Sequence, residues 1–344
     1  MRLGSACFSL ALLLGGMAAQ AAPQAAGQPD LTAVKADFVP GEKVIFYDDF
    51  TDMTGDEPPP HWKVRGGAVT LKVGGGVRQL TATDRTELTP NLKGIPKNFT
   101  LETEVKFDNP GDLRSVWSFH PKDGGEEGLY VWTQTHGTGL VVHLKTLHDE
   151  IGEAEPEPDF SKPIKMALWV QNGRVRFYVN GQRVVDANQV DLPPLDTAML
   201  LAELYGDNSA IGYRMVRLAE STPDFSQVIS STGRYVTHGI LFDTDSDRIK
   251  TESAAVIKSI ARGLETNPTL KLRIDGHTDA TGAAEHNLDL SKRRAEAVKA
   301  VLVAQFHVAA DRLTASGLGA GKPVDSNDTP QGRAQNRRVE FVKQ

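Results

Sequence analysis

The chain has 344 residues, a formal net charge of −6 and a single cysteine, Cys7. At roughly 100 to 200 residues per domain, this length predicts two domains. The excess of acidic residues excludes partners that need a broad basic face, such as nucleic acid. Because the single cysteine lies near the N-terminus, the rest of the chain has no disulfides, no thiol catalysis and no cysteine-based zinc sites.

Residues 1–21 have the pattern of a cleaved signal peptide. Arg2 precedes an apolar run at 6–17, and the run ends in the small-residue site Ala19-Gln20-Ala21. The run is shorter than the roughly 18 residues that a membrane span needs. We therefore expect export to a bacterial periplasm. Residues 22–42 are rich in Ala, Gln and Pro without a sustained period, which predicts a flexible leader.

Residues 43–220 have the composition of an all-β domain, with short β-branched and aromatic runs separated by Gly, Pro, Asn and Asp. Within 99–107, apolar residues alternate with charged ones, so one face of a strand is buried. Asn172-Gly173 and Asn180-Gly181 predict two consecutive hairpins. Because no long helical period interrupts the region, we predict a jelly-roll-like β-sandwich.

The aromatic residues of this region suggest where its core lies. All four tryptophans fall within it, and we expect them to anchor the space between two sheets: Trp62, Trp117, Trp132 and Trp169. Tyr130 and Trp132 could instead stack on sugars. Alternate aromatic positions on a strand more often face the core, which is the placement that we expect.

Three segments of the sandwich region resemble the concanavalin A-like jelly-roll superfamily, including laminin-G-type modules: residues 46–50, Trp62 and residues 175–181. Glu102 and Glu104 have the alternate spacing of the catalytic carboxylates in jelly-roll glucanases. They lack the surrounding Glu-x-Asp-x-x-Glu pattern, so we expect a solvated face and no catalytic residue. The alternative is a carbohydrate-active hydrolase tethered to peptidoglycan.

A polar, proline-containing stretch at 221–232 predicts a linker, after which strands and helices alternate over 233–344. The pattern predicts an α+β domain with a β-α-β-α-β core and a short helix before its last strand. The expected elements are strands at 238–242, 270–274, 313–316 and 338–342, a helix that begins near Thr251, and a second helix at 287–306.

Four segments of this second domain keep a characteristic order and spacing: ILFDTDSDRI at 240–249, GHTDATG at 276–282, NLDLSKRRAEAV at 287–298 and GRAQNRRVEF at 332–341. Together they resemble the OmpA-like peptidoglycan-binding family. In that family, an Asp of the turn and an Arg of the helix bind the zwitterionic end of diaminopimelate in the stem peptide. The matching residues are Asp279 and Arg294. By resemblance, four more residues complete the pocket: Asp245, Thr278, Asn287 and Arg337.

The chemistry of the residues agrees with that resemblance. An amino-acid head group presents an ammonium and a carboxylate, and Arg offers the carboxylate a bidentate fork that Lys lacks. Asn287, Ser291 and Arg294 share one helix face, so Arg294 can reach back toward Asp279. The simpler alternative is a surface pair between these two residues, which contributes about 0 to 1 kcal/mol.

Histidine-based chemistry has little support in the sequence. No His-x-x-x-His spacing accompanies His277, which we expect to be a hydrogen-bonded structural side chain, and we expect no metal site and no cofactor. We therefore predict a non-enzymatic periplasmic protein that binds the peptidoglycan stem peptide through residues 233–344. The sandwich would face a glycan or protein partner, and association with the outer membrane would depend on a partner.

Overall fold

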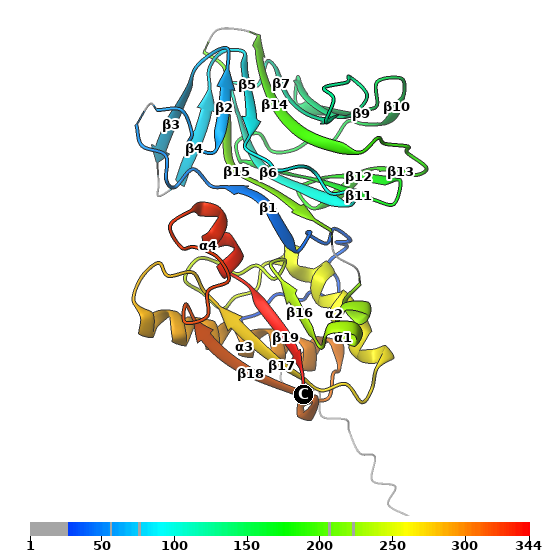
Figure 1. Ribbon diagram of the computed structural model, residues 1–344, viewed down its shortest axis with the longest axis vertical. Coiled ribbons are helices and arrows are strands. Elements are labelled where there is room, and N and C mark those ends of the chain that lie inside the picture. Colours follow the sequence, from blue (N-terminus) through cyan, green and yellow to red (C-terminus); the bar gives the residue numbers. More distant parts are fainter. Residues whose placement is uncertain (1–26, 56, 75–76, 206–207, 222–223) are drawn as a thin grey trace, which may run out of the picture.

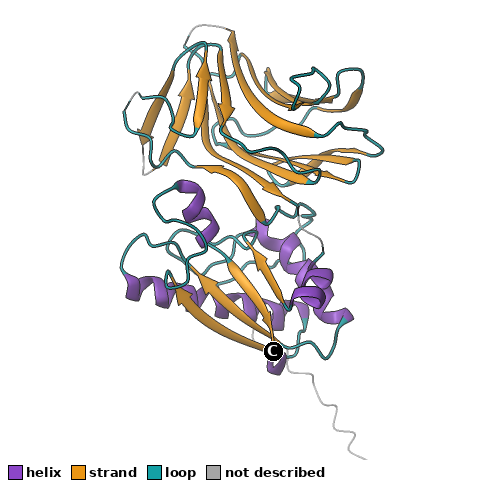
Figure 2. Cartoon of the chain, in the orientation of Figure 1, coloured by secondary structure: helices purple, strands orange, loops and turns teal. Residues whose placement is uncertain are grey.

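The computed structural model describes residues 27–344 apart from residues 56, 75–76, 206–207 and 222–223. An all-β domain is followed by an α+β domain, and Figure 2 shows the helices in the second domain only. The predicted signal peptide at 1–21 lies outside the described residues. Within the described part, no helix is long and apolar enough to cross a membrane.

The first domain is a sandwich of two antiparallel sheets, which confirms the predicted fold class (Figure 1). Eight strands form one sheet: β1 (Lys43–Asp48), β3 (Val69–Gly74), β4 (Val77–Ala82), β6 (Phe99–Asp108), β11 (Ile164–Gln171), β12 (Arg174–Val179), β13 (Gln182–Ala187) and β15 (Ala210–Glu220). Seven strands form the other: β2 (Trp62–Arg65), β5 (Thr86–Pro90), β7 (Asp112–Pro121), β8 (Leu129–His136), β9 (Gly139–Lys145), β10 (Glu150–Ala154) and β14 (Leu195–Tyr205).

The alternation read in the sequence sets the inner face of the sandwich. In β6, Phe99, Leu101 and Val105 are buried in the core between the sheets. The hairpins that join β11, β12 and β13 turn where predicted, and Asn172 (φ 51°) and Gly173 (φ 77°) have the left-handed conformation of a two-residue turn. The register of the eight-stranded sheet is therefore fixed locally by its turns.

The prediction that all four tryptophans lie in the core is correct for two of them. Trp62 and Trp117 are buried, with ring centroids 6.3 Å apart. Trp132 and Trp169 are half-buried on outer faces, because their neighbours along the strands point inward. Tyr130 shares the outer face with Trp132, so the core placement expected for both was wrong.

The second domain contains a four-stranded sheet in the order β16-β19-β17-β18, which confirms the predicted α+β fold. Only β17 and β18 run parallel. The strands are β16 (Arg234–Thr237), β17 (Leu272–His277), β18 (Leu313–Gly319) and β19 (Val339–Lys343). The helices are α1 (Phe225–Thr232), α2 (Ala254–Thr266), α3 (Ala284–Phe306) and α4 (Pro330–Asn336), with short 3-10 turns η1 (Thr251–Ser253) and η2 (Ala310–Arg312).

Two elements differ from the sequence prediction near the start of this domain. The first strand is at 234–237, and the expected strand at 238–242 forms only an isolated bridge between Phe242 and Ile249. The expected linker contains α1, whose first turn is capped by the Asp224 carboxylate accepting from the Ser226 amide at 2.8 Å. Phe225 is buried in the second domain's core, which explains how α1 is held against that domain.

The expected flexible leader also packs on the second domain from residue 27 onward. Leu31 is 0% exposed and belongs to the core of that domain. Its amide donates to the Gln305 side chain at 2.9 Å. Lys258 donates to the carbonyls of Thr32 and Val34 at 3.0 and 2.7 Å. One buried leucine and a few hydrogen bonds thus order a segment whose composition predicts none.

Candidate binding site

The helix that carries the predicted arginine lies directly on the central strand of the second domain. A Cβ atom at Gly276 would come within 2.2 Å of the Ser291 carbonyl oxygen, so only glycine allows α3 to approach β17 this closely. The Ser291 hydroxyl accepts from the Gly319 amide at 2.9 Å. These contacts fix the first half of α3 beside the turn that follows β17.

The turn between β17 and α3 is held by Asn287. Its side-chain amide donates to the carbonyls of Thr281 and Asp279 at 3.0 and 3.3 Å. The Asp279 carboxylate in turn accepts from the Thr281 amide at 2.9 Å. Asn287 is buried and touches the turn from the first helical turns of α3. Asn287 therefore positions Asp279.

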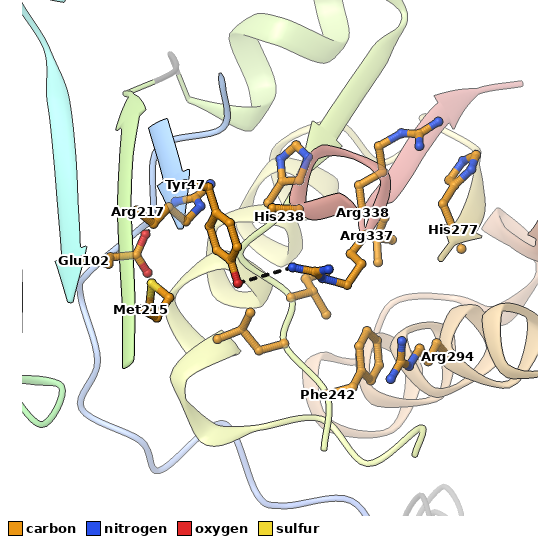
Figure 3. A pocket seen from close by; sticks show the side chains of 15 residues that line it. Tyr47, Glu102, Met215, Arg217, His238, Phe242, His277, Arg294, Arg337 and Arg338 are labelled. Atoms are coloured by element: carbon orange, nitrogen blue, oxygen red, sulfur yellow. Dashed lines mark hydrogen bonds and ion pairs between the residues drawn. The ribbon is translucent and has the colours of Figure 1, made fainter. Parts of the chain in front are cut away.

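Asp279 forms an ion pair with Arg337, at 2.8 Å between Oδ2 and the guanidinium. Burial alone would raise the pKa of Asp279, but the hydrogen bonds from Arg337 and the Thr281 amide lower it below its usual value. The alternative of a surface pair with Arg294 does not occur. Arg337 also donates to the hydroxyl of Tyr47 at 3.3 Å, which links this site to the sandwich (Figure 3).

Arg294 has a half-buried guanidinium, and its hydrogen bonds within the described residues go to two backbone carbonyls, those of Ser246 at 2.9 Å and Asp243 at 3.4 Å. Its guanidinium carbon lies 4.9 Å from the centre of the Phe242 ring, and the two side chains are adjacent in Figure 3. Burial and the nearby Arg293 lower the pKa of Arg294 from its usual value, although a guanidinium stays charged in proteins. The neighbouring Arg293 differs, because it pairs with two carboxylates.

A cavity of about 260 Å³ lies between the two domains, and its lining includes Arg294, Arg337 and Tyr47. Four arginines line it: Arg217, Arg294, Arg337 and Arg338. Three of them are paired, Arg217 with Glu102, Arg337 with Asp279, and Arg338 with Glu340. Among the described residues, no carboxylate comes within 4.0 Å of Arg294. The cavity therefore contains one positive charge that lacks an ion-pair partner within the described chain.

Two other predicted residues lie around the same turn. Thr278 is 6% exposed, and its hydroxyl has no hydrogen-bond partner among the described residues. A buried hydroxyl without a partner is costly, because it has lost its bonds to water without gaining others. Asp245 lies on the exposed loop before η1, in a left-handed conformation (φ 52°), and binds His286 at 2.6 Å. Its carboxylate does not contact Arg294.

Sequence reasoning missed three features of this region. Tyr47 comes from the other domain, so no motif of the second domain could include it. His286 lies in the four residues between two matched segments and carried no signal. His277 was expected to be hydrogen-bonded, yet neither ring nitrogen has a hydrogen-bond partner among the described residues, and Nε2 lies 3.3 Å from Glu340 without suitable geometry.

The charge state of His277 follows from its burial. The residue is 4% exposed, and this burial, together with the nearby Arg338, lowers its pKa to about 4. His277 is therefore neutral at neutral pH. Within the described residues, no three His, Cys, Asp or Glu side chains gather where they could hold a metal ion. In the sandwich, Glu102 and Glu104 each form an ion pair with an arginine.

Residues 241–337 match the model of the OmpA family. Among curated proteins, outer membrane porin F of Pseudomonas aeruginosa is 43% identical over 101 residues, which cover 29% of this chain and 29% of that one. The peptidoglycan-binding protein ArfA of Mycobacterium tuberculosis is 41% identical over 108 residues, covering 31% and 33%. This chain thus spans a third or less of the length of either relative.

Solved structures resemble each half of the chain separately. The peptidoglycan-associated lipoprotein of Burkholderia pseudomallei is 35% identical, covers 30% of this chain and 88% of its own, and has a TM-score of 0.29. A β-glucanase of Bacillus licheniformis is 15% identical, covers 52% of this chain and 98% of its own, and has a TM-score of 0.39.

Proposed function

Because its C-terminal region is an OmpA-family domain, we propose that this protein binds peptidoglycan non-covalently through that domain. Arg294 binds the carboxylate and Asp279 the ammonium of the free end of diaminopimelate in the stem peptide. The protein acts without catalysis, in the periplasm, and the sandwich faces a glycan or protein partner. Association with the outer membrane depends on a partner.

The observation that carries the proposal is the unpaired charge of Arg294 in the cavity between the domains. A half-buried guanidinium is costly unless an anion or several acceptors compensate it. The carbonyls of Ser246 and Asp243 occupy two of its nitrogens and leave the remaining N–H groups for a ligand. A carboxylate is the anion that fits a planar guanidinium best, apart from phosphate.

The ammonium half of the ligand is matched by Asp279. Its two oxygens each accept one hydrogen bond from the chain, and a carboxylate has about four acceptor positions, so room remains for an ammonium donor. The lowered pKa of Asp279 keeps it ionised. In this proposal Arg337 and Asn287 hold Asp279 in place, Thr278 offers its free hydroxyl, and Asp245 adds negative charge at the rim.

The alternative of a carbohydrate-active hydrolase in the sandwich receives less support. Glu102 and Glu104 project from the same face of β6, as the spacing predicted, but each is bound by an arginine from β15. A catalytic carboxylate must be free to reach the substrate, whereas these two carboxylates are held by Arg217 and Arg214 on the same sheet. We therefore assign these acids to packing of the sheet surface and not to catalysis.

The proposal is tested by co-sedimentation of the full-length protein with purified peptidoglycan sacculi. Arg294→Ala and Asp279→Ala should each abolish sedimentation, since removing one partner of a buried charge pair costs roughly 2 to 5 kcal/mol. Arg293→Ala is the matched control, because it removes a neighbouring arginine that is already paired with Asp247 and Asp289. Undiminished sedimentation of the Arg294→Ala and Asp279→Ala variants would contradict the proposal.

A further inference from the structure

We infer that Tyr47 of the sandwich is a positioning residue of the binding site in the second domain, so that peptidoglycan affinity depends on the docked sandwich. The inference rests on the proposed function. Tyr47 fixes Arg337, and Arg337 fixes Asp279. A side chain that lies 290 residues away from Arg337 in the sequence therefore controls the group that receives the ammonium.

Tyr47 makes two kinds of contact with Arg337. Its hydroxyl accepts from the guanidinium at 3.3 Å, and the guanidinium carbon lies 5.6 Å from the centre of its ring. Burial raises the pKa of Tyr47 to about 12, so the hydroxyl stays neutral at any ordinary pH. The same hydroxyl lies 3.4 Å from Asp49, whose carboxylate accepts from it. Tyr47 thus has a defined donor and a defined acceptor.

The approach of Tyr47 to the site is part of a built interface. The Gln335 side chain of α4 donates to the Val44 carbonyl of β1 at 2.9 Å, and Arg333 donates to the Thr51 hydroxyl at 2.6 Å. Figure 1 shows α4 against β1 between the two domains. Since Arg337 directly follows α4, the sandwich holds the segment that carries Arg337 as well as its side chain.

A second contact between the domains lies next to β1, at Glu42. Glu42 is buried, and its carboxylate accepts from the Tyr235 hydroxyl at 3.0 Å and from the His238 amide at 2.8 Å. A buried carboxylate with two donors from the other domain is a specific contact, because it would be costly to leave unsatisfied. The position of β1 against the second domain is therefore determined by several independent contacts.

The cavity itself is shared by the two domains. Its sandwich wall consists of Tyr47, Glu102, Met215 and Arg217, and Figure 3 shows Tyr47 reaching from this wall toward Arg337. Arg217 and Glu102 neutralise each other. The sandwich therefore contributes shape and the Tyr47 hydroxyl to the site, whereas the unpaired positive charge comes from Arg294 in the second domain.

Loss of the Tyr47 hydroxyl should loosen the arginine. The Arg337 side chain is 37% exposed, so without its bond to Tyr47 it can leave Asp279 for solvent. An arginine side chain has many rotamers, and the site would then have to order it upon binding. We expect the dissociation constant for a diaminopimelate-containing stem peptide to rise about three- to tenfold, which is less than the full value of a hydrogen bond from a charged group because this bond is long, at 3.3 Å.

The test is a double-mutant cycle on the full-length protein, measured by calorimetric titration with that stem peptide. Tyr47→Phe keeps the ring and removes the hydroxyl, and it should weaken binding about three- to tenfold in the wild-type background. In the Arg337→Ala background the same change should have no further effect. Tyr205→Phe is the matched control, because it removes another tyrosine hydroxyl of the sandwich that accepts from an arginine, Arg114, at 3.4 Å, outside the cavity, and it should leave affinity within about twofold.

Three results would overturn the inference: unchanged affinity of Tyr47→Phe, an equal loss in the Arg337→Ala background, or an equal loss in Tyr205→Phe. Failure of the proposed function gives a different result. In that case the wild-type protein does not bind the peptide, or Arg294→Ala binds it as tightly as the wild type. If Arg294→Ala loses binding while Tyr47→Phe does not, only the role of Tyr47 is wrong.

Discussion

Replacing Leu31 with alanine tests whether the segment before the sandwich is part of the second domain. Leu31 is 0% exposed within the core formed with α2 and α3. Truncating a buried leucine costs about 2 to 5 kcal/mol, and a segment that can peel away belongs at the lower end of that range. We expect the free energy of unfolding of the second domain to fall by about 2 to 3 kcal/mol.

The two domains can be followed separately in one urea titration. All four tryptophans are in the sandwich, whereas the helices of the described residues are in the second domain, so fluorescence reports on one and circular dichroism at 222 nm on the other. With the usual dependence of the free energy of unfolding on urea concentration, the midpoint followed by circular dichroism should fall by about 1 M urea. The midpoint followed by fluorescence should not change. Leu288→Ala, at a leucine that is 52% exposed, is the control. If Leu31→Ala lowers the dichroism midpoint no more than Leu288→Ala does, Leu31 does not contribute to the core as we infer.

Two further predictions concern the stability of the same domain. His277 is buried and neutral with a pKa of about 4, so the unfolded state binds its proton first as pH falls below about 6.5. The contribution of His277 to the free energy of unfolding, up to about 3 kcal/mol, is therefore present at neutral pH and lost as pH falls from about 6.5 to about 4. Urea titrations across this range should show that the free energy of unfolding depends less on pH in His277→Gln than in the wild type. An equal pH dependence in the two proteins would contradict this prediction. Gly276→Ala should destabilise the domain by more than about 2 kcal/mol, because the added methyl collides with the Ser291 carbonyl, and a wild-type urea midpoint would argue against that close approach.

The sequence predicted most of the sandwich because alternation states directly which residues face inward. The expectation that every tryptophan anchors the core failed for Trp132 and Trp169, since a large aromatic residue is tolerated on an outer face where a cation covers it. The guanidinium of Arg114 lies 5.3 Å from the Trp132 ring, and that of Arg176 lies 4.6 Å from the Trp169 ring. The periodicity of one strand cannot reveal these contacts, because the arginines lie on the neighbouring strands.

Order in segments of low complexity was also beyond sequence reasoning. A single leucine, Leu31, carries no period, and a polar stretch such as 221–232 gives little sign that Phe225 reaches the core of the second domain. Both segments are fixed by long-range burial. In physical terms, the placement of Leu31 and Phe225 depends on the core of the second domain, which is formed elsewhere in the chain, and not on the composition of their own segments.

The sequence singled out the residues of the proposed site, but it did not predict how they pair in the structure. The motifs identified Asp279, Arg294 and Arg337, and helix spacing allowed Arg294 to reach Asp279. In the structure Arg337 takes that partner, and Arg294 remains without one among the described residues. Spacing along one helix defines what a side chain can reach, whereas the choice between two arginines depends on where β1 and α4 place Arg337.

The central claim is that Arg294 receives a ligand carboxylate, and calorimetric titration of the full-length protein with two stem peptides tests it most directly. One peptide contains diaminopimelate, and the other contains lysine, which lacks the second carboxylate. We predict measurable binding of the first peptide, at least tenfold weaker binding of the second, and loss of this preference in Arg294→Ala. Equal affinity of the wild-type protein for both peptides would contradict the account.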